Sequence, residues 1–427
     1  MILTADLVEF IDTYKNQIYK HVDYNINDSP LIKGEIYVKL IQKYELGENL
    51  LDESSKFYIE TFIDSYISKI VAEYNERKNN KLNISTKLQA LKSLTLPEQR
   101  SKEWYEMRET MLTASSLADS LGKGHFKKRE DLLIEKTSKE PPARFWSPII
   151  EWGVRYEQVA TTFYEKMNQL TVLEFGLVPH PKLKIFGASP DGICDENSPK
   201  DFIGRMLEIK CPPVRKFTKE VPEHYWMQMQ GQLETCDLEE CDFLQVKLEE
   251  YSNEDEYNED NGEENTDKEK QSSIGITSKG FPKGLVLSFV KTINGETKYN
   301  YEYSEFYTSF EDIKTWSEKV IEDYSLEYDK IVYHWWRIER YECTLVHRDR
   351  KWWLDTVPEI LNFWEDVEHF RKVGNQELID KKEEKKQKRK NSRKKKETKK
   401  DIKNIITINQ DITKQVENNY LLGSDSD

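Results

Sequence analysis

The segment GASPDGICDENSPKDFIGRMLEIK, residues 187–210, places a charged residue inside an apolar run. Glu208 stands between Leu207 and Ile209, a pattern typical of a buried strand. A carboxylate in such a strand is costly unless it has a partner, so the sequence predicts a ligand for Glu208. Because strand side chains alternate with a period of two, Lys210 is expected on the same face as Glu208.

Asp191 belongs to the same segment, at an SPDG turn that we interpret as the bend of a hairpin. The hairpin would bring Asp191 and Glu208 to a shared ion, which the carbonyl of Ile209 can also reach. Such hard oxygen ligands suit Mg²⁺ or Mn²⁺. Lys210, beside two carboxylates, stays cationic and could orient the attacking water or stabilise developing charge. The pattern predicts a metal-dependent phosphodiesterase site, with a surface salt bridge between Glu208 and Lys210 as the alternative.

The chain of 427 residues is long enough for more than one domain. Apolar residues at helical spacing predict a helical N-terminal unit over residues 1–90, and the polar stretch 79–100 is interpreted as a linker. Residues 91–375 form the second domain, in which helices alternate with strand-like runs. We expect an α/β (α+β) class domain, with a mixed sheet flanked by helices. The tryptophan-rich stretch 310–372 is predicted to be helical, with most tryptophans in the core.

The formal net charge of −14 argues at first against nucleic acid as a partner. However, the acid excess is concentrated in Glu249–Lys270, and Lys381–Lys400 is strongly basic. We expect an acidic loop insertion at 249–272 that is disordered on the surface. The basic C-terminal tail, residues 376–427, is predicted to be disordered; it could be a nuclear-localisation signal, a nucleic-acid tether or a solvated end.

The five cysteines have neither zinc-finger nor iron–sulfur spacing, and their odd number does not indicate a disulfide framework. No apolar run approaches the roughly 20 residues that a membrane span needs. From this we expect a soluble intracellular protein in a reducing compartment, with no membrane partner.

Five motifs in order, namely WYEMRETMLTAS, EWGVRYEQVA, GASPDG, LEIKCP and YWMQMQGQLE, resemble those of the PD-(D/E)xK nucleases. Within these nucleases the chain is most similar to the phage lambda exonuclease and YqaJ-type viral recombinase family. The resemblance covers residues 98–250, and the later text VHRDRKWWLDTVPEILNFWEDV is also similar. It implies a restriction-endonuclease-like fold and metal-dependent digestion of linear double-stranded DNA from an end, usually 5′ to 3′.

The resemblance also implies roles for individual acids. Asp191 and Glu208 match the metal ligands of the family, and Lys210 matches its catalytic lysine. Glu157, in the GxxYE pattern of a predicted helix, matches an acid that helps to bind a second ion. The implied cofactor is Mg²⁺, for which Mn²⁺ can substitute, with two ions at the site.

By the same resemblance, Arg108 and Ser115 match positions that hold a terminal 5′-phosphate, and Ser189 supplies a further hydroxyl nearby. An arginine fork suits bidentate recognition of phosphate. We therefore expect these residues to form an anion pocket that sets polarity and processivity.

Tyr225, Gln228 and Gln232 fall on one face of a predicted helix, at spacings of three and four residues. The two glutamines are expected to position the site or the DNA backbone, or else to form a simple polar face. His125 and His224 have no evident partner in the sequence, and we interpret them as ordinary residues.

The implied partners are double-stranded DNA ends, a single-strand annealing protein and further copies of the chain, although the insertion and the N-terminal unit leave the oligomeric state open. The Lys-, Asn- and Ile-rich composition is associated with large DNA viruses, which suggests a protein in the host cytoplasm or the virion, or in the nucleus through its basic tail. Two alternatives stay open: an endonuclease of the same superfold, and a non-catalytic DNA-binding recombination protein.

Overall fold

The structure is a computed structural model, and it describes most of the chain. Among the described residues no helix is both long and apolar enough to cross a membrane. The described ranges are 4–14, 17–18, 29–44, 52–138, 147–214, 217, 220–260, 274–293, 296–324 and 327–388.

The first helices form a unit with a core of their own. They are α1 (Thr4–Asp12), α3 (Ser29–Lys43) and α4 (Glu53–Lys92). The side chain of Asp52 caps α4 by accepting a hydrogen bond from the backbone N–H of Ser55 at 2.6 Å. Isoleucines dominate the core of this unit, which includes Ile11, Ile36, Ile63, Ile67 and Ile70.

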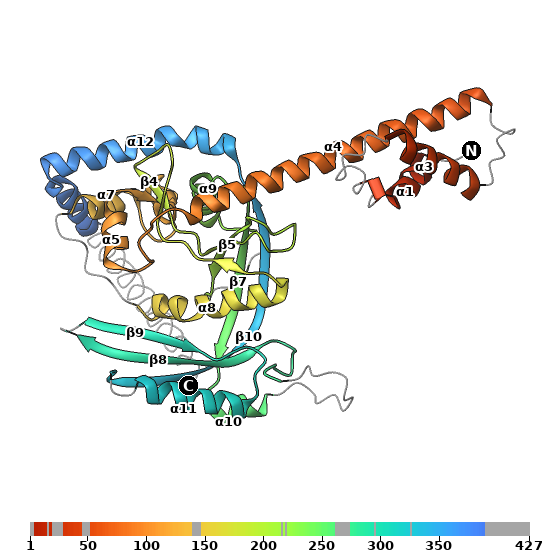
Figure 1. Cartoon of the computed structure of the whole chain (residues 1–427). Helices are drawn as coiled ribbons and strands as arrows, with labels where there is room; N and C mark the ends of the chain where they lie inside the picture. Colours follow the sequence, from red (N-terminus) through yellow and green to blue (C-terminus); the bar gives the residue numbers. More distant parts are fainter. Residues whose placement is uncertain are drawn as a thin grey trace, which may run out of the picture.

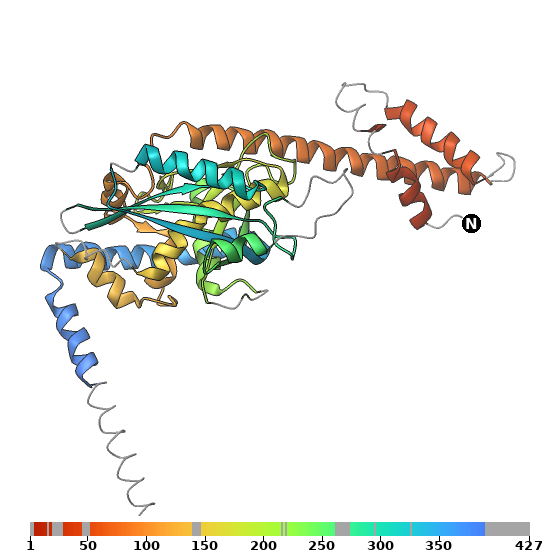
Figure 2. The ribbon, with the colours of Figure 1, turned by 90° about the horizontal axis from the view of Figure 1, so that it is seen from below.

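Helix α4 runs without a break through the start of the predicted linker, so that prediction is wrong over residues 79–92. Figures 1 and 2 show α4 reaching from the N-terminal helices to the sheet. Near its end, Ile84, Leu88 and Leu91 pack into the core beneath the sheet. The stretch looked like a linker because its apolar side chains stop at the first core and resume only at the second.

A seven-stranded mixed sheet forms the centre of the second domain, which confirms the predicted fold class. Its strands follow the order β2-β5-β6-β7-β10-β8-β9, and only β6 and β7 pair in parallel. The long strands β7 and β10 lead from α9 and α12 at one end to α10 and α11 at the other (Figure 1). The bounds are β2 Val172–Leu173, β5 Gly192–Cys194, β6 Met206–Lys210, β7 Glu240–Glu250, β8 Lys283–Ile293, β9 Glu296–Tyr303 and β10 Lys330–His347.

The tryptophan-rich stretch 310–372 is not wholly helical as predicted. Between α11 (Phe310–Tyr324) and α12 (Arg350–Val373) it contains β10, which pairs with both β7 and β8. A bulge between Ile338 and Arg340 shifts the register of β10, which hides its alternation in the sequence. The expectation that most tryptophans are core residues is confirmed for Trp335, Trp336, Trp353 and Trp364.

A second sheet has three strands. In the small sheet β4 lies between β1 and β3. The SPDG turn is not the bend of a hairpin as predicted, because β4 before it and β5 after it belong to different sheets. The remaining elements are α5 Lys102–Glu109, β1 Leu112–Thr113, a 3₁₀ turn Ala114–Ser116, α6 Leu117–Ser120, α7 Arg129–Thr137, α8 Pro148–Asn168, β3 Val178–Pro179, β4 Phe186–Ala188, α9 Glu223–Cys236 and α10 Glu254–Glu259.

The predicted acidic loop at 249–272 is partly structured. Its first residues end β7, and α10 follows with Tyr257 buried at 1% exposure. Residues 261–273 lie outside the described residues. The tail also begins in a helix, because residues 376–388 are helical and Lys385 pairs with Glu130 at 2.6 Å. The rest of the predicted disordered tail, from 389, lies outside the described residues.

The packing of α4 on the sheet domain can be tested with Leu88, which has no exposed surface. Leu88→Ala is expected to lower the free energy of unfolding of this domain by about 2–5 kcal/mol, because it removes buried contacts and leaves a cavity. Gln89→Ala, exposed on the same turn, is the matched control and should change it by less than about 0.5 kcal/mol. Urea unfolding followed by tryptophan fluorescence measures both; equal effects would mean that α4 does not belong to this core.

Candidate active site

The centre of the site is Glu208, in the middle of β6, with no exposure to solvent. Three side chains donate hydrogen bonds to its carboxylate. Lys210 Nζ and Gln228 Nε2 reach Oε1, the latter at 2.7 Å, and Gln232 Nε2 reaches Oε2 at 2.7 Å. The sequence-predicted residues Glu208, Lys210, Gln228 and Gln232 therefore meet at one point.

Asp191 lies beside Glu208, because β5 begins directly after Asp191 and pairs antiparallel with β6, the strand that carries Glu208. One oxygen, Oδ2, accepts a hydrogen bond from the backbone N–H of Ile209 at 2.7 Å. Glu157, on α8, contributes a third carboxylate close enough to influence Glu208 and Lys210 electrostatically. In this structure its Oε2 accepts a hydrogen bond from Arg100 at 2.8 Å.

The charges at this point are strongly coupled. Burial, followed by the charges of Glu208 and Glu157, raises the pKa of Asp191 well above its usual value. Burial also raises the pKa of Glu157, against the opposing charges of Arg100 and Lys210. For Lys210, burial acts to lower the pKa, but the carboxylates of Glu208 and Asp191 outweigh it and raise the pKa. The lysine is therefore held as a cation among acids that resist joint ionisation.

The donor set fits a hard divalent cation. In the described part of the chain no three His, Cys, Asp or Glu residues are grouped as ligands of one ion. The available set is smaller, namely the carboxylates of Asp191 and Glu208 together with the carbonyl of Ile209. Mg²⁺ commonly takes one or two carboxylates and keeps several water molecules, so this set is sufficient. An added positive charge would also relieve the repulsion that raises the pKa of Asp191.

Tyr225 supports the lysine rather than the carboxylates. Its ring lies 5.0 Å from Lys210 Nζ, and on the other side it packs against Phe243 with ring centroids 5.5 Å apart. A cation held over an aromatic ring is attracted to it and loses freedom to move. The predicted face of α9, Tyr225, Gln228 and Gln232, thus fixes the orientation of both Lys210 and Glu208.

The predicted phosphate-binding residues also come together. Arg108, at the end of α5, donates a hydrogen bond to Ser115 Oγ at 3.2 Å, and its guanidinium lies 4.4 Å from the ring of Trp104. The indole N–H of Trp104 donates in turn to Ser189 Oγ at 3.1 Å. Since Ser189 is two residues from Asp191, this cluster borders the carboxylates.

Lys136, on α7, supports the cluster from beneath. It is 6% exposed and donates a hydrogen bond to the backbone carbonyl of Arg108 at 2.6 Å. Arg371, on α12, donates to the carbonyls of Lys136 and Glu109 at 3.0 and 2.7 Å. Two helices therefore fix the backbone that carries Arg108, and they add positive charge near it.

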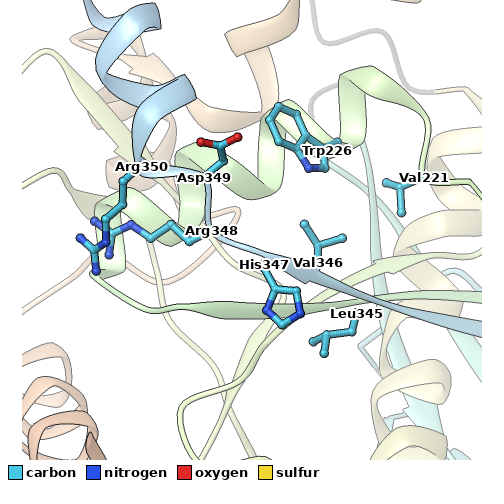
Figure 3. A pocket seen from close by; sticks show the side chains of 8 residues that line it. All are labelled: Val221, Trp226, Leu345, Val346, His347, Arg348, Asp349 and Arg350. Atoms are coloured by element: carbon cyan, nitrogen blue, oxygen red, sulfur yellow. The ribbon is translucent and has the colours of Figure 1, made fainter.

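A pocket of about 630 Å³ lies elsewhere, where β10 ends and α12 begins (Figure 3). Its lining residues, which include Trp226 and Arg348, do not include Asp191, Glu208 or Glu157. Arg348 in this pocket already donates to Glu234 at 2.6 Å and to Asp237 at 2.7 Å. We interpret this pocket as a structural ion-pair site and not as the place of the chemistry.

Sequence reasoning missed Arg100, Trp104 and Lys136. Trp104 and Arg108 are four residues apart on one helix, so their contact could have been predicted from spacing. Arg100 and Lys136 reach the site across 57 and 28 residues of chain, and no local pattern signals either contact. Arg100 also has a positive φ of 68°, which is uncommon for a residue with a side chain.

Residues 103–239 match the family model of the YqaJ-like viral recombinase domain. An uncharacterized protein of Acanthamoeba polyphaga mimivirus is 26% identical over 387 residues, which cover 81% of this chain and 68% of that protein. A protein of African swine fever virus is 29% identical over 161 residues, 32% of this chain and 46% of its own length. The chain thus matches less than half of the second relative.

Two solved structures are also similar. An alkaline exonuclease from Laribacter hongkongensis has 18% sequence identity and a TM-score of 0.37, over 66% of this chain and 99% of that one. A phage related exonuclease from Haemophilus somnus has 9% identity and a TM-score of 0.32, over 63% of this chain and 96% of that one.

The burial of Lys136 predicts a pH dependence. Burial, aided by Arg108 and Arg371 and opposed by Glu109, lowers the pKa of Lys136 to about 8. Above that pH the unfolded chain, with an ordinary lysine pKa of about 10.4, binds more protons than the folded one, so folding gains stability as the pH rises. Relative to Lys136→Met, the free energy of unfolding of the wild type should rise by up to about 1.4 kcal/mol per pH unit between the folded and unfolded pKa of Lys136.

Urea unfolding at several pH values from about 7.5 to about 9.5 measures this difference. Lys102→Met is the matched control, because the Lys102 side chain is 81% exposed and so is not desolvated by folding. A flat profile for Lys136→Met as well would show that Lys136 is not titrating in the folded protein.

Proposed function

We propose, from the match of residues 103–239 to the YqaJ-like viral recombinase domain, that the chain is a metal-dependent deoxyribonuclease. The proposed substrate is linear double-stranded DNA, digested from an end in the 5′ to 3′ direction during recombination, repair or viral genome processing. The proposed cofactor is Mg²⁺, with Mn²⁺ as a substitute. The observation that carries the proposal is the fully buried Glu208, bound by Lys210, Gln228 and Gln232 beside Asp191.

The arrangement suits phosphodiester hydrolysis for an electrostatic reason. Asp191, Glu208 and the carbonyl of Ile209 would hold the ion, and Glu157 would help to hold a second one. When bound, a divalent ion supplies a water of lowered pKa and neutralises charge on the phosphate. Lys210 keeps its proton next to two carboxylates, so it can donate a hydrogen bond to a phosphate oxygen where negative charge develops.

The remaining residues position these groups. Gln228 and Gln232 hold both oxygens of Glu208, so its side chain cannot turn away from the site. Tyr225 limits the motion of Lys210. Such supporting contacts matter for catalysis, because a displaced ligand or acid loses alignment with the scissile bond.

The cluster around Arg108 would receive the terminal 5′-phosphate. Burial lowers the pKa of Arg108, which indicates a cation that lacks full solvation and would gain from an anion. Ser115 and Ser189 add hydroxyl donors, and Trp104 holds the guanidinium over its ring. An anion pocket beside the carboxylates would bind the terminal 5′-phosphate of a chain end. An uninterrupted strand has no such terminal phosphate and would not fill the pocket.

The catalytic proposal predicts that Lys210→Ala digests linear duplex DNA in Mg²⁺ at least about 100-fold more slowly than the wild type, because a donor to the developing charge is lost. Lys39→Ala is the matched control. On α3, in the N-terminal unit with its own core, Lys39 likewise pairs with a glutamate, Glu35, at 2.6 Å. The rate of nucleotide release, measured by acid solubility, distinguishes the two variants.

A covalently closed circle of the same sequence separates the alternatives. The wild type should leave it intact, whereas cleavage of the circle would favour an endonuclease of the same superfold. If neither linear nor circular DNA is digested in Mg²⁺ or Mn²⁺, the non-catalytic DNA-binding alternative replaces the proposal.

The phosphate pocket predicts a separate effect for Arg108→Ala. The wild type should digest a 5′-phosphorylated duplex faster than a 5′-hydroxyl duplex, and the substitution should reduce this preference by about 10- to 100-fold, as expected for loss of one charge-assisted contact. Arg350→Ala, an exposed arginine paired with Glu239, is the control. An unchanged ratio of rates in Arg108→Ala would place phosphate recognition elsewhere.

A further inference from the structure

An exposed aromatic ring stands close to the candidate active site. Phe126 lies in the loop between α6 and α7 and is 83% exposed. A phenyl ring held in water is unfavourable, and the same loop carries Lys123, Lys127 and Lys128. An aromatic ring among basic residues is the combination that proteins use to bind unpaired nucleic acid.

The ring belongs to a continuous series that leads to the catalytic lysine. His125 stacks on His224 of α9, with ring centroids 5.3 Å apart and planes 14° from parallel, and Phe126 meets His224 edge-on at 6.1 Å. His224 contacts Tyr225 at 4.1 Å, and Tyr225 lies beneath Lys210. We call Phe126, His125, His224 and Tyr225 the aromatic series; it links solvent to the site.

The loop is held in a fixed shape, so Phe126 is presented and does not swing freely. Gly122 has a φ of +71°, and its N–H donates to the carbonyl of Asp119 at 3.0 Å. Gly124 has no room for a side chain, because an added Cβ would lie 1.9 Å from Asp119 Oδ1 and 2.4 Å from the carbonyl of Lys127. Lys123 also pairs with Glu223 at the start of α9, at 3.1 Å.

We propose that Phe126, backed by His125 and His224, is a stacking platform for a base of unpaired DNA beside the catalytic centre. The inference rests on the proposed nuclease function, because digestion of one strand from a duplex end leaves the other strand without its partner. Each base presents a π-face, so such a platform would act on any sequence. Lys123 and Lys127 already pair with Glu223 and Glu135, so the exposed Lys128 would contact the phosphates of the same strand.

Equilibrium binding tests the platform without any cleavage. A fluorescein-labelled single-stranded oligonucleotide is titrated in EDTA and followed by anisotropy. Phe126→Ala should weaken binding by about 5- to 100-fold, as for loss of one base–aromatic contact, and Phe126→Trp should restore it. Phe57→Ala, which removes a ring that is 71% exposed on α4, is the matched control and should bind like the wild type.

An oligonucleotide of equal length made of abasic sites gives the second arm. It keeps the phosphates but offers no base, so wild type and Phe126→Ala should bind it equally. An equal loss on both oligonucleotides would overturn the proposal, because the loss would then come from phosphate contacts or a changed loop. No loss on either would also overturn it, because the ring would then contribute nothing to the binding of single-stranded DNA.

The failure of this inference and of the nuclease proposal are distinguishable. If the wild type digests linear duplex but Phe126→Ala weakens binding of the normal and abasic oligonucleotides equally, only the platform is refuted. Base-dependent binding at Phe126 without digestion in any divalent metal would refute the nuclease and leave the platform standing.

Discussion

The carboxylate of Glu208, at the centre of β6, has no exposure to solvent. The surrounding structure must therefore supply the hydrogen-bond donors that water would otherwise supply. Removing a carboxylate from water costs several kcal/mol, which an imperfect set of partners does not offset. One of its donors, Lys210, is on the same strand, but Gln228 and Gln232 are on α9. The helix must therefore be seated on the sheet before the charge is compensated, so the site assembles only as the fold completes.

The sequence predicts those parts of the site whose geometry is local. Glu208 and Lys210 share a face because a strand has a period of two, and Tyr225, Gln228 and Gln232 share one because a helix repeats after three or four residues. Each relation holds within ten residues of chain and needs no knowledge of the rest of the fold. The mixed sheet was predictable for a related reason, since β5, β6 and β8 contain apolar runs that follow turn-forming residues.

What the sequence does not predict depends on contacts between distant segments. The stacking of His125 on His224 joins residues 99 positions apart in the sequence, and no periodicity signals it. The strand β10 was misread because it lies between β7 and β8 and its bulge breaks the alternation. Helix α4 was divided wrongly because a helix that joins two cores needs apolar side chains only where it touches them, as at Ile63 and Leu88.

Charge distribution explains how a chain of net charge −14 could act on DNA. Charges separated by more than the screening length of about 8 Å in physiological salt interact weakly, so distant acids have little influence at the site. Close to the carboxylates the chain gathers Arg100, Arg108, Lys136 and Lys210. Duplex binding along the backbone depends on phosphate neutralisation over many contacts. Under the proposed function, a DNA end that reaches these cations would therefore bind more tightly than an internal stretch of duplex that does not reach them.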